Sequence, residues 1–291
     1  MAVLYSLFIQ NCILAVIAMK LSIITINRNN TAGLEKTLQS VAFQTFKEFE
    51  YIVVDGASTD GSVEVIKKFE PQFSQLKWVS EPDSGIYNAM NKGIRMASGE
   101  YCQFLNSGDM LASNGVVGIM MEKLREKDYP DVLYGNMKKV MPDGSSFVDV
   151  CGATDDVTLN MFYKGCLNHS PAYIRRSLFD KYGMYDESLK ICSDWKFYMQ
   201  SIVQGGATVR YVDVLVTVFD MGGISETRKD VLEEERNRLL HEMVPQGVLK
   251  DYDKYHYPMS QYDRLKRHHL WGLVSFVERV LFKLEKWHIL R

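Results

Sequence analysis

Residues 100–109 read Glu-Tyr-Cys-Gln-Phe-Leu-Asn-Ser-Gly-Asp, and this stretch decides the fold. Residues 101–105 are apolar and aromatic, which predicts a buried strand. The three residues 106–108 are turn formers, so the strand ends there and Asp109 follows at once. A carboxylate at the carboxyl end of a buried strand lies where open α/β sheets bind their ligands.

Two roles fit Asp109 on this segment alone. A hard divalent cation such as Mg²⁺ takes some oxygen ligands from protein and the rest from phosphate and water, so Asp109 is a candidate metal ligand. The alternative is an ordinary helix cap, because a helix is predicted to begin near Ser113.

The composition limits the classes of protein that fit. A chain of 291 residues forms one large domain, or one domain with an appendage. Because 34 basic and 36 acidic residues leave a net charge of −2, no general affinity for nucleic acid is indicated. The five cysteines include no Cys-x-x-Cys pair, which is typical of reduced thiols in a cytoplasmic protein and not of a disulfide framework or a zinc site.

The first 19 residues are almost all apolar and stand apart from the first predicted strand. Gln10 and Asn11 interrupt them, and a membrane span needs about 20 apolar residues. They also lack the basic start of a signal peptide. We favour an extension upstream of a true start at Met19, with an apolar anchor helix as the alternative.

Strand-like and helix-like segments alternate from Leu21 to Asp109. Such alternation predicts a parallel sheet with right-handed crossovers, in which all strands end at one edge. No Gly-x-Gly-x-x-Gly or P-loop motif follows any strand, so a metal is a better candidate than a glycine-rich loop for phosphate binding. The predicted strands are 21–26, 51–54, 76–79 and 101–105, and the helical patterns are 31–41, 63–69 and 86–97.

Four motifs together resemble a family 2 glycosyltransferase with a GT-A fold, over about residues 20–225. The resemblance implies an α/β fold with a mostly parallel central sheet, and an inverting transferase of hexosyltransferase type that uses a nucleotide-sugar donor, most often a UDP-sugar, with Mg²⁺ or Mn²⁺. The motifs are Leu-Ser-Ile-Ile-Thr-Ile-Asn-Arg-Asn-Asn (21–30), Tyr-Ile-Val-Val-Asp-Gly-Ala-Ser-Thr-Asp-Gly-Ser (51–62), Asp-Ser-Gly-Ile-Tyr-Asn-Ala-Met-Asn-Lys-Gly-Ile (83–94) and Phe-Leu-Asn-Ser-Gly-Asp (104–109).

The resemblance also implies a set of donor-binding residues. Thr25 and Arg28 would line the nucleotide pocket, and Asp55 would bind the base. Asp83 and Asn91 would contact base or ribose and help to close the pocket.

The metal motif departs from the family pattern. Asp109 matches the last acid of an Asp-x-Asp motif, whereas the earlier acid is replaced within the run Asn106–Asp109. Asn106 remains a candidate donor contact. One carboxylate and the diphosphate can still hold Mg²⁺, because Mg²⁺ keeps several waters.

The resemblance implies that Asp194, in the run Ile191–Tyr198, is the general base that deprotonates the acceptor hydroxyl. The alternative is that Ser193 or Asp194 caps the following helix. Further candidate contacts to acceptor or phosphate are His169, Asp220 and Ser225.

The sequence predicts three regions: the extension 1–19, a GT-A domain 20–243, and a basic amphipathic helical tail 244–291. The domain divides into a nucleotide-binding half, 20–110, and an acceptor-side half, 111–243. A hairpin through Pro142-Asp143-Gly144 is predicted in the second half. The acidic run Glu233–Glu235 is predicted to be an exposed helix face.

The tail carries seven basic and three acidic residues between Asp263 and Arg291, a net charge of +4. A basic amphipathic helix of this kind fits an anionic membrane surface. A helix docked on the catalytic domain or on a partner subunit fits equally well.

These observations favour a glycosyltransferase that acts on a glycan or lipid-linked acceptor, in bacterial surface polysaccharide or lipopolysaccharide synthesis. Its expected location is the cytoplasm, or the inner face of the cytoplasmic membrane. One alternative is a sugar-nucleotide nucleotidyltransferase, although Asn27–Asn30 stands where that class has a glycine-rich loop. Another is a non-catalytic sugar-nucleotide-binding protein, since the first metal-motif acid is lost.

Overall fold

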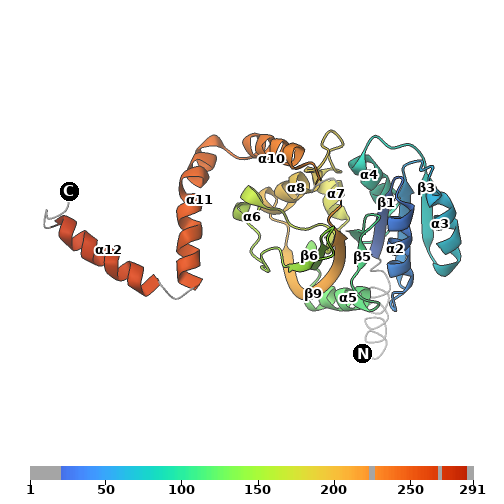
Figure 1. The fold of residues 1–291 in the computed structure, drawn as a ribbon, viewed down its shortest axis with the longest axis horizontal. Helices are drawn as coiled ribbons and strands as arrows, with labels where there is room; N and C mark the ends of the chain where they lie inside the picture. Colours follow the sequence, from blue (N-terminus) through green and yellow to red (C-terminus); the bar gives the residue numbers. More distant parts are fainter. Residues whose placement is uncertain (1–20, 223–226, 268–270, 287–291) are drawn as a thin grey trace, which may run out of the picture. The chain divides into compact units, whose positions relative to one another are not determined.

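The computed structural model describes residues 21–222, 227–267 and 271–286 (Figure 1). The predicted extension 1–19 and the candidate Ser225 lie outside the described residues. The chain divides into two compact units; the first ends at Glu235 and the second begins at Arg236. Each unit is described by itself.

The described part of the first unit contains a nine-stranded mixed sheet in the order β3-β2-β1-β4-β8-β6-β9-β5, with β7 paired to β6. The strands are β1 (Leu21–Asn27), β2 (Phe49–Asp55), β3 (Leu76–Ser80), β4 (Tyr101–Phe104), β5 (Met110–Leu111), β6 (Val132–Val140), β7 (Ser146–Asp149), β8 (Ala172–Arg175) and β9 (Val209–Asp220).

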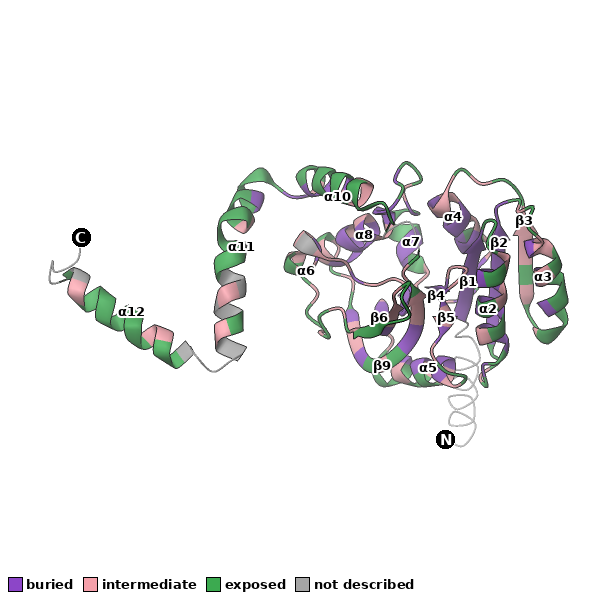
Figure 2. Ribbon diagram, viewed as in Figure 1, coloured by how far each residue is buried: buried purple, intermediate pink, exposed green. Residues whose placement is uncertain are grey.

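The predicted nucleotide-binding half has the expected alternation of strands and helices. Strands β3, β2, β1 and β4 are parallel neighbours, connected through α2 (Thr31–Ala42), α3 (Ser62–Phe69) and α4 (Ile86–Met96). Every residue of β1 and β2 is buried (Figure 2). Their apolar, β-branched sequences fit this position, because strands inside a parallel sheet are covered on both faces.

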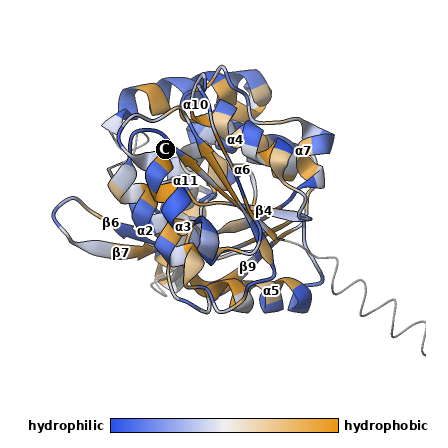
Figure 3. Ribbon diagram, turned by 90° about the vertical axis from the view of Figure 1, so that its right-hand side faces the viewer, coloured by the Kyte–Doolittle hydropathy of each residue, from blue (hydrophilic) through white to orange (hydrophobic). Residues whose placement is uncertain are grey.

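The second half differs, because β8 joins antiparallel to both β4 and β6. Parallel pairing returns only between β6 and β9 among the described strands. The predicted hairpin is confirmed: β6 and β7 pair antiparallel and project from the sheet (Figure 3), and Gly144 takes a φ of 83° in their turn. The helices here are α5 (Val116–Glu126), α6 (Leu159–Lys164), α7 (Ser177–Tyr182) and α8 (Ser193–Tyr198), which a π-helical turn (Met199–Gln204) extends.

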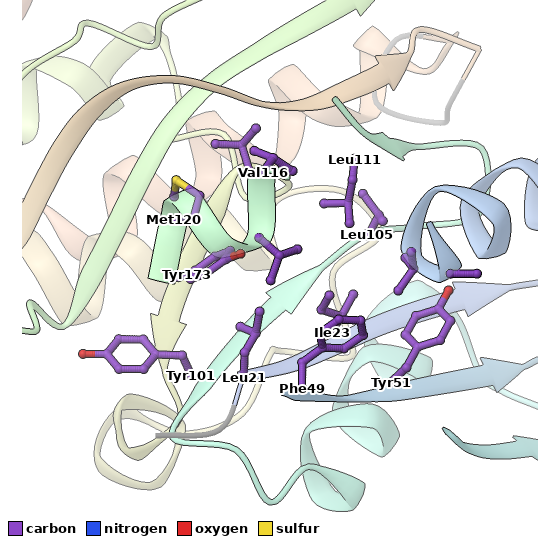
Figure 4. Close-up of a cluster of buried hydrophobic side chains, with 14 of the residues drawn as sticks. Leu21, Ile23, Phe49, Tyr51, Tyr101, Leu105, Leu111, Val116, Met120 and Tyr173 are labelled. Carbon is purple, nitrogen blue, oxygen red and sulfur yellow. The ribbon is translucent and has the colours of Figure 1, made fainter. Parts of the chain in front are cut away.

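One hydrophobic cluster joins the two halves (Figure 4). Tyr101, at the start of β4, also donates a hydrogen bond from its hydroxyl to the carbonyl of Pro130 at 2.8 Å. The two halves of the sheet therefore share one core. The labelled members are Leu21, Ile23, Phe49, Tyr51, Tyr101, Leu105, Leu111, Val116, Met120 and Tyr173.

The helix α10 (Lys229–Met243) crosses from the first unit into the second, which continues with α11 (Gln246–Arg267) and α12 (Trp271–Lys286). None of the described helices is both long and apolar enough to cross a membrane.

Near the amino ends of the strands, the buried carboxylate of Glu50 ties several segments together. It accepts hydrogen bonds from Ser22, Ser98 and the amide of Gly99, and pairs with Lys77 at 2.8 Å. Burial alone raises the pKa of Glu50, but the hydrogen bonds, that of Lys77 first, outweigh it and lower the pKa from 4.5 to about 2.

Glu50→Gln should therefore lower the unfolding free energy at pH 7 by about 3 kcal/mol. The stabilisation is fully present above pH 4.5 and is lost as the pH falls through 2, so the difference from wild type should shrink with falling pH. Urea unfolding at several pH values measures it. Glu81→Gln, which breaks a half-exposed ion pair with Lys92, is the control and should change little. A pH-independent difference for Glu50→Gln would contradict this account.

Candidate active site

The candidate site lies at the carboxyl ends of β1, β2 and β4. Asn27 and Asp55 are register partners at the ends of β1 and β2. The turn after β4 is held beside them, because the amide of Ser107 donates to the carbonyl of Ile26 at 3.1 Å. The polar residues that follow separate strands in the sequence thus meet at one edge, as predicted.

Asp55 joins the ends of β1, β2 and β3. Its fully buried carboxylate accepts hydrogen bonds from Asn27 at 2.8 Å, from the hydroxyl of Ser58 at 2.6 Å and from Ser80 at 2.6 Å. Burial raises the pKa of Asp55, but these bonds outweigh it and lower the pKa below its usual value. Both carboxylate oxygens are used inside the protein, so Asp55 holds the edge together.

Two more of the expected nucleotide contacts have internal partners. Thr25 is fully buried and donates from its hydroxyl to the carbonyl of Leu105 at 2.7 Å. Asn91, only 2% exposed, donates to the carbonyl of Tyr185 and to Glu187, both at 2.8 Å, and accepts from the amide of Tyr185. These side chains fix the walls of the site.

Arg28 and Asp83 follow β1 and β3 at this edge, and Arg28 is the exposed member of the pair. They form an ion pair at 3.6 Å, with 64% of the Arg28 side chain exposed and 5% of the Asp83 side chain. A Cβ on Gly56 would lie 2.2 Å from Oδ2 of Asp83, so only glycine lets this carboxylate reach over the end of β2. Gly56 was not singled out from the sequence.

Asp109 is held in its turn by the backbone. Its amide donates to the carbonyl of Asn106 at 2.9 Å, and Thr37 of α2 donates to its carbonyl at 2.7 Å. Its side chain is 4% exposed. Among the described residues, Oδ2 of Asp109 and Oδ1 of Asn106 are buried with no hydrogen-bond partner. The next helix begins only at Val116, so the helix-cap alternative is wrong.

Burial raises the pKa of Asp109 from 3.8 to about 7, against the opposing influence of His169. A backbone hydrogen bond from Asp220 also opposes the shift, and the charge of Asp220 adds to it, so Asp220 lies beside Asp109. Burying a carboxylate oxygen without a donor is costly, and such a group is suited to receive a cation.

The donor set fits a metal that takes much of its coordination elsewhere. Asp109 offers a carboxylate oxygen and Asn106 an amide oxygen, which suit Mg²⁺ or Mn²⁺. No three His, Cys, Asp or Glu side chains form a metal-binding group in the part of the chain that is described. A bound ion would therefore complete its coordination with phosphate and water.

Asp194 is held by two side chains. Its Oδ2 lies 3.3 Å from Nδ1 of His169, and its Oδ1 lies 3.1 Å from the hydroxyl of Tyr87, which also bonds to the carbonyl of Ile191. The neighbouring Ser193 hydroxyl is buried with no partner among the described residues. Neither side chain caps α8, so the capping alternative is wrong here too.

His169 brings the two predicted acids into one neighbourhood. Burial lowers the pKa of His169, but its hydrogen bond and attraction to Asp194, with a contribution from Asp109, raise the pKa above 6.5. Its Nε2 atom is buried without a partner in the described structure. His169 therefore interacts with both acids, with Asp194 through Nδ1 and with Asp109 electrostatically.

The sequence missed two residues that support Asp194. Tyr87 was treated as one position of a helix. Glu235 was predicted to be exposed, which is wrong: it is 8% exposed and accepts from the amides of residues 190–192. Glu235 and the buried Leu239 are an i, i+4 pair, which places Glu235 on the apolar face of α10. This spacing is the sequence signal from which its burial could have been predicted.

Comparison with known proteins shows which family the chain belongs to. The model of the family described as "Glycosyl transferase family 2" matches residues 22–182. The chain belongs to this family. It is 33% identical over 213 residues to an "Uncharacterized glycosyltransferase" of Mycobacterium tuberculosis, covering 72% of this chain and 78% of that protein. It is 29% identical over 211 residues to a "PGL/p-HBAD biosynthesis glycosyltransferase" of Mycobacterium bovis, covering 72% and 80%.

Solved structures share the fold. Residues 1–349 of S. aureus TarS, in complex with UDP-GlcNAc, match with a TM-score of 0.60 and 21% identity, covering 80% of this chain and 70% of that one. The chain spans 44% of a longer TarS chain. The mannosyltransferase PcManGT of Pyrobaculum calidifontis, in complex with GDP-Man and Mn²⁺, matches with a TM-score of 0.51 and 18% identity, covering 68% and 56%. The chain is a glycosyltransferase with a GT-A fold.

Asp109→Asn should stabilise the protein when no ligand is bound. The folded-state pKa of Asp109 lies above its usual value, so ionisation costs stability as the pH rises from 3.8 through 7. Removing the charge should raise the unfolding free energy at pH 8 by about 2–4 kcal/mol and change it little near pH 4. Thermal unfolding at both pH values measures this. Glu50→Gln, which should be destabilising at pH 8, is the opposite control; a less stable Asp109→Asn at pH 8 would refute the prediction.

Proposed function

We propose that this enzyme transfers a sugar, with inversion, from a nucleotide-diphosphate sugar, UDP-sugars first, to an acceptor hydroxyl. One observation carries the proposal: a buried carboxylate with an unpartnered oxygen and a second, oriented carboxylate both interact with the same histidine at the ligand-binding edge. The TarS structures with UDP and UDP-GlcNAc support this class of donor.

On the donor side, Arg28 and Asp83 contact the base or ribose, because the exposed Arg28 and its ion-pair partner follow β1 and β3 at this edge. Asn106 and Asp109 face the diphosphate, while Thr25, Asp55 and Asn91 act through the walls that they build. Mg²⁺ or Mn²⁺, when bound at Asp109, supplies positive charge to the leaving diphosphate. The Mn²⁺ complex of PcManGT supports this choice of metal.

On the acceptor side, Asp194 is the general base. The acceptor oxygen forms a bond to the anomeric carbon as the bond from that carbon to the diphosphate oxygen breaks, and the hydroxyl proton passes to Asp194. A single displacement of this kind inverts the anomeric centre. His169 orients Asp194 through the contact of its Nδ1 with Oδ2. Asp220 and Ser225 remain candidate contacts to acceptor or phosphate.

Asp194→Asn tests the proposal. Release of UDP from a panel of UDP-sugars with candidate acceptors should fall about 10²–10⁴-fold, because the general base is lost. Binding of UDP with Mn²⁺, measured by calorimetry, should stay near wild type, whereas Asp109→Asn should lose the Mn²⁺-dependent part. Asp230→Asn, in an exposed ion pair with Arg228, is the control.

Three results would overturn this function. Retention of the wild-type rate by Asp194→Asn would show that Asp194 is not the base. Pyrophosphate release from UTP and a sugar phosphate would favour the nucleotidyltransferase alternative. Mn²⁺-dependent UDP binding with no turnover of any UDP-, GDP- or dTDP-sugar would favour a non-catalytic binding protein.

We also propose that α12 docks on an anionic membrane surface, where a lipid-linked acceptor would be presented. Five of the six large apolar residues described as exposed on α12 recur at i, i+3, i+4, i+7 and i+8, the pattern of one helix face, while Phe282 lies off this face. The sequence around it is basic, with a net charge of +4 between Asp263 and Arg291. Such a face fits a bilayer interface at the inner side of the bacterial membrane, and bacterial surface glycan synthesis is the matching pathway. The stripe is Leu273, Phe276, Val277, Val280 and Leu281.

The full chain should co-sediment with phosphatidylglycerol-containing vesicles, and less with pure phosphatidylcholine or at high salt, because both apolar insertion and charge contribute. A variant with Phe276→Asp and Val280→Asp should lose most of this binding. Phe147→Asp with Val148→Asp, exposed residues of the β7 strand, is the matched control and should keep it. Wild-type binding by the α12 variant, or self-association through α12 in light scattering, would contradict membrane docking.

A further inference from the structure

The carboxylate of Glu235 makes an unusual set of contacts. Its Oε1 accepts from the amide of Lys190 at 2.7 Å, and its Oε2 accepts from the amides of Ile191 and Cys192, both at 3.0 Å. Glu235 is 8% exposed, so three consecutive backbone donors converge on one nearly buried anion. Hydrogen bonds to an ionised acceptor are stronger than those between neutral groups, so they hold this turn firmly.

The turn that Glu235 holds leads directly into the candidate base. Cys192 is the residue before α8, and Asp194 lies in the first turn of that helix. No side chain of α8 or its flanking residue caps the helix start. Of the three donors, the amide of Cys192 belongs to the helix start and the other two precede it, and Glu235 accepts from all three from a helix more than 40 residues later in the chain.

A second connection runs from the same turn to the carboxylate of Asp194. The carbonyl of Ile191 accepts from the hydroxyl of Tyr87, and that hydroxyl lies 3.1 Å from Oδ1 of Asp194. Fixing the peptide of Ile191 therefore fixes Tyr87, and Tyr87 in turn fixes one oxygen of Asp194. The side chain and the backbone of Asp194 are both controlled by the segment that Glu235 binds.

We propose that Glu235 is a positioning residue for this glycosyltransferase, which sets the angle at which Asp194 meets the acceptor hydroxyl. The inference rests on the proposed role of Asp194 as the base. The hydrogen bonds of Glu235 described above are to residues 190–192, whereas Arg28 and Asp83 pair with each other. Loss of Glu235 therefore affects the proton-transfer step and not donor binding. Small displacements of a catalytic group have large effects on rate, which makes such support necessary.

Glu235→Ala should lower kcat about 10–100-fold while the KM for the donor and the stoichiometry of UDP binding stay unchanged. The acidic limb of the pH–rate profile should also move, because the surroundings of Asp194 change; a merely structural loss would scale the rate at all pH values alike. Glu235→Gln keeps an oxygen acceptor and should restore part of the rate. Glu233→Ala and Glu234→Ala, exposed on the same helix, should match wild type.

A double-mutant cycle separates this inference from the proposed function. If both residues act on one step, adding Glu235→Ala to Asp194→Asn should cost little more than Asp194→Asn alone. Full additivity, or an unchanged kcat in Glu235→Ala, would overturn the positioning role while Asp194→Asn remains impaired. An unimpaired Asp194→Asn would instead overturn the proposed base itself.

Discussion

Carboxylates buried at the carboxyl edge of the parallel strands are the constraint on which this structure depends. Asp55 and Asp109 both lie there with almost no exposure. Both oxygens of Asp55 accept hydrogen bonds, and these bonds lower the pKa of Asp55, so its charge helps to hold three strand ends. Asp109 keeps an oxygen without a donor in the described structure, and its pKa rises to about 7. Asp55 therefore stabilises the fold, whereas the unpartnered oxygen of Asp109 can bind a positively charged ligand.

The two oxygens of Asp194 have neighbours from different elements. The hydroxyl of Tyr87, on α4, has one proton and two acceptors in reach, the carbonyl of Ile191 and Oδ1 of Asp194. On the other side, Nδ1 of His169 lies 3.3 Å from Oδ2 of Asp194. Because each oxygen has its own neighbour, the orientation of the Asp194 carboxylate is fixed by residues distant from it in the sequence.

The sequence predicted the parallel half well, because each strand is a short apolar run and each helix shows its own period. It also singled out Asp109 and Asp194 through their resemblance to family motifs, and their roles as metal ligand and base stay predictions. It did not predict what Thr25, Asp55 and Asn91 bind, since most of their side-chain partners lie 25 to 96 residues away, the exception being Ser58, three residues after Asp55. The prediction that Glu235 is exposed was wrong for the same reason. An acidic run predicts an exposed helix face, and the backbone amides that bind Glu235 lie more than 40 residues away in the sequence.

Helix α4 explains why the fold and the site form together. It belongs to the parallel half, yet two side chains one turn apart hold the other half: Tyr87 binds the turn before Asp194, and Asn91 binds the segment at Tyr185. Asp194 is therefore in place only when the mixed half of the sheet is packed against α4. Because Asp109 comes from the parallel half and Asp194 from the other, the distance between the two acids is set by this packing. A weakened contact at α4 would separate the two acids without altering either of them, so the chemistry depends on how the halves are joined as much as on the acids themselves.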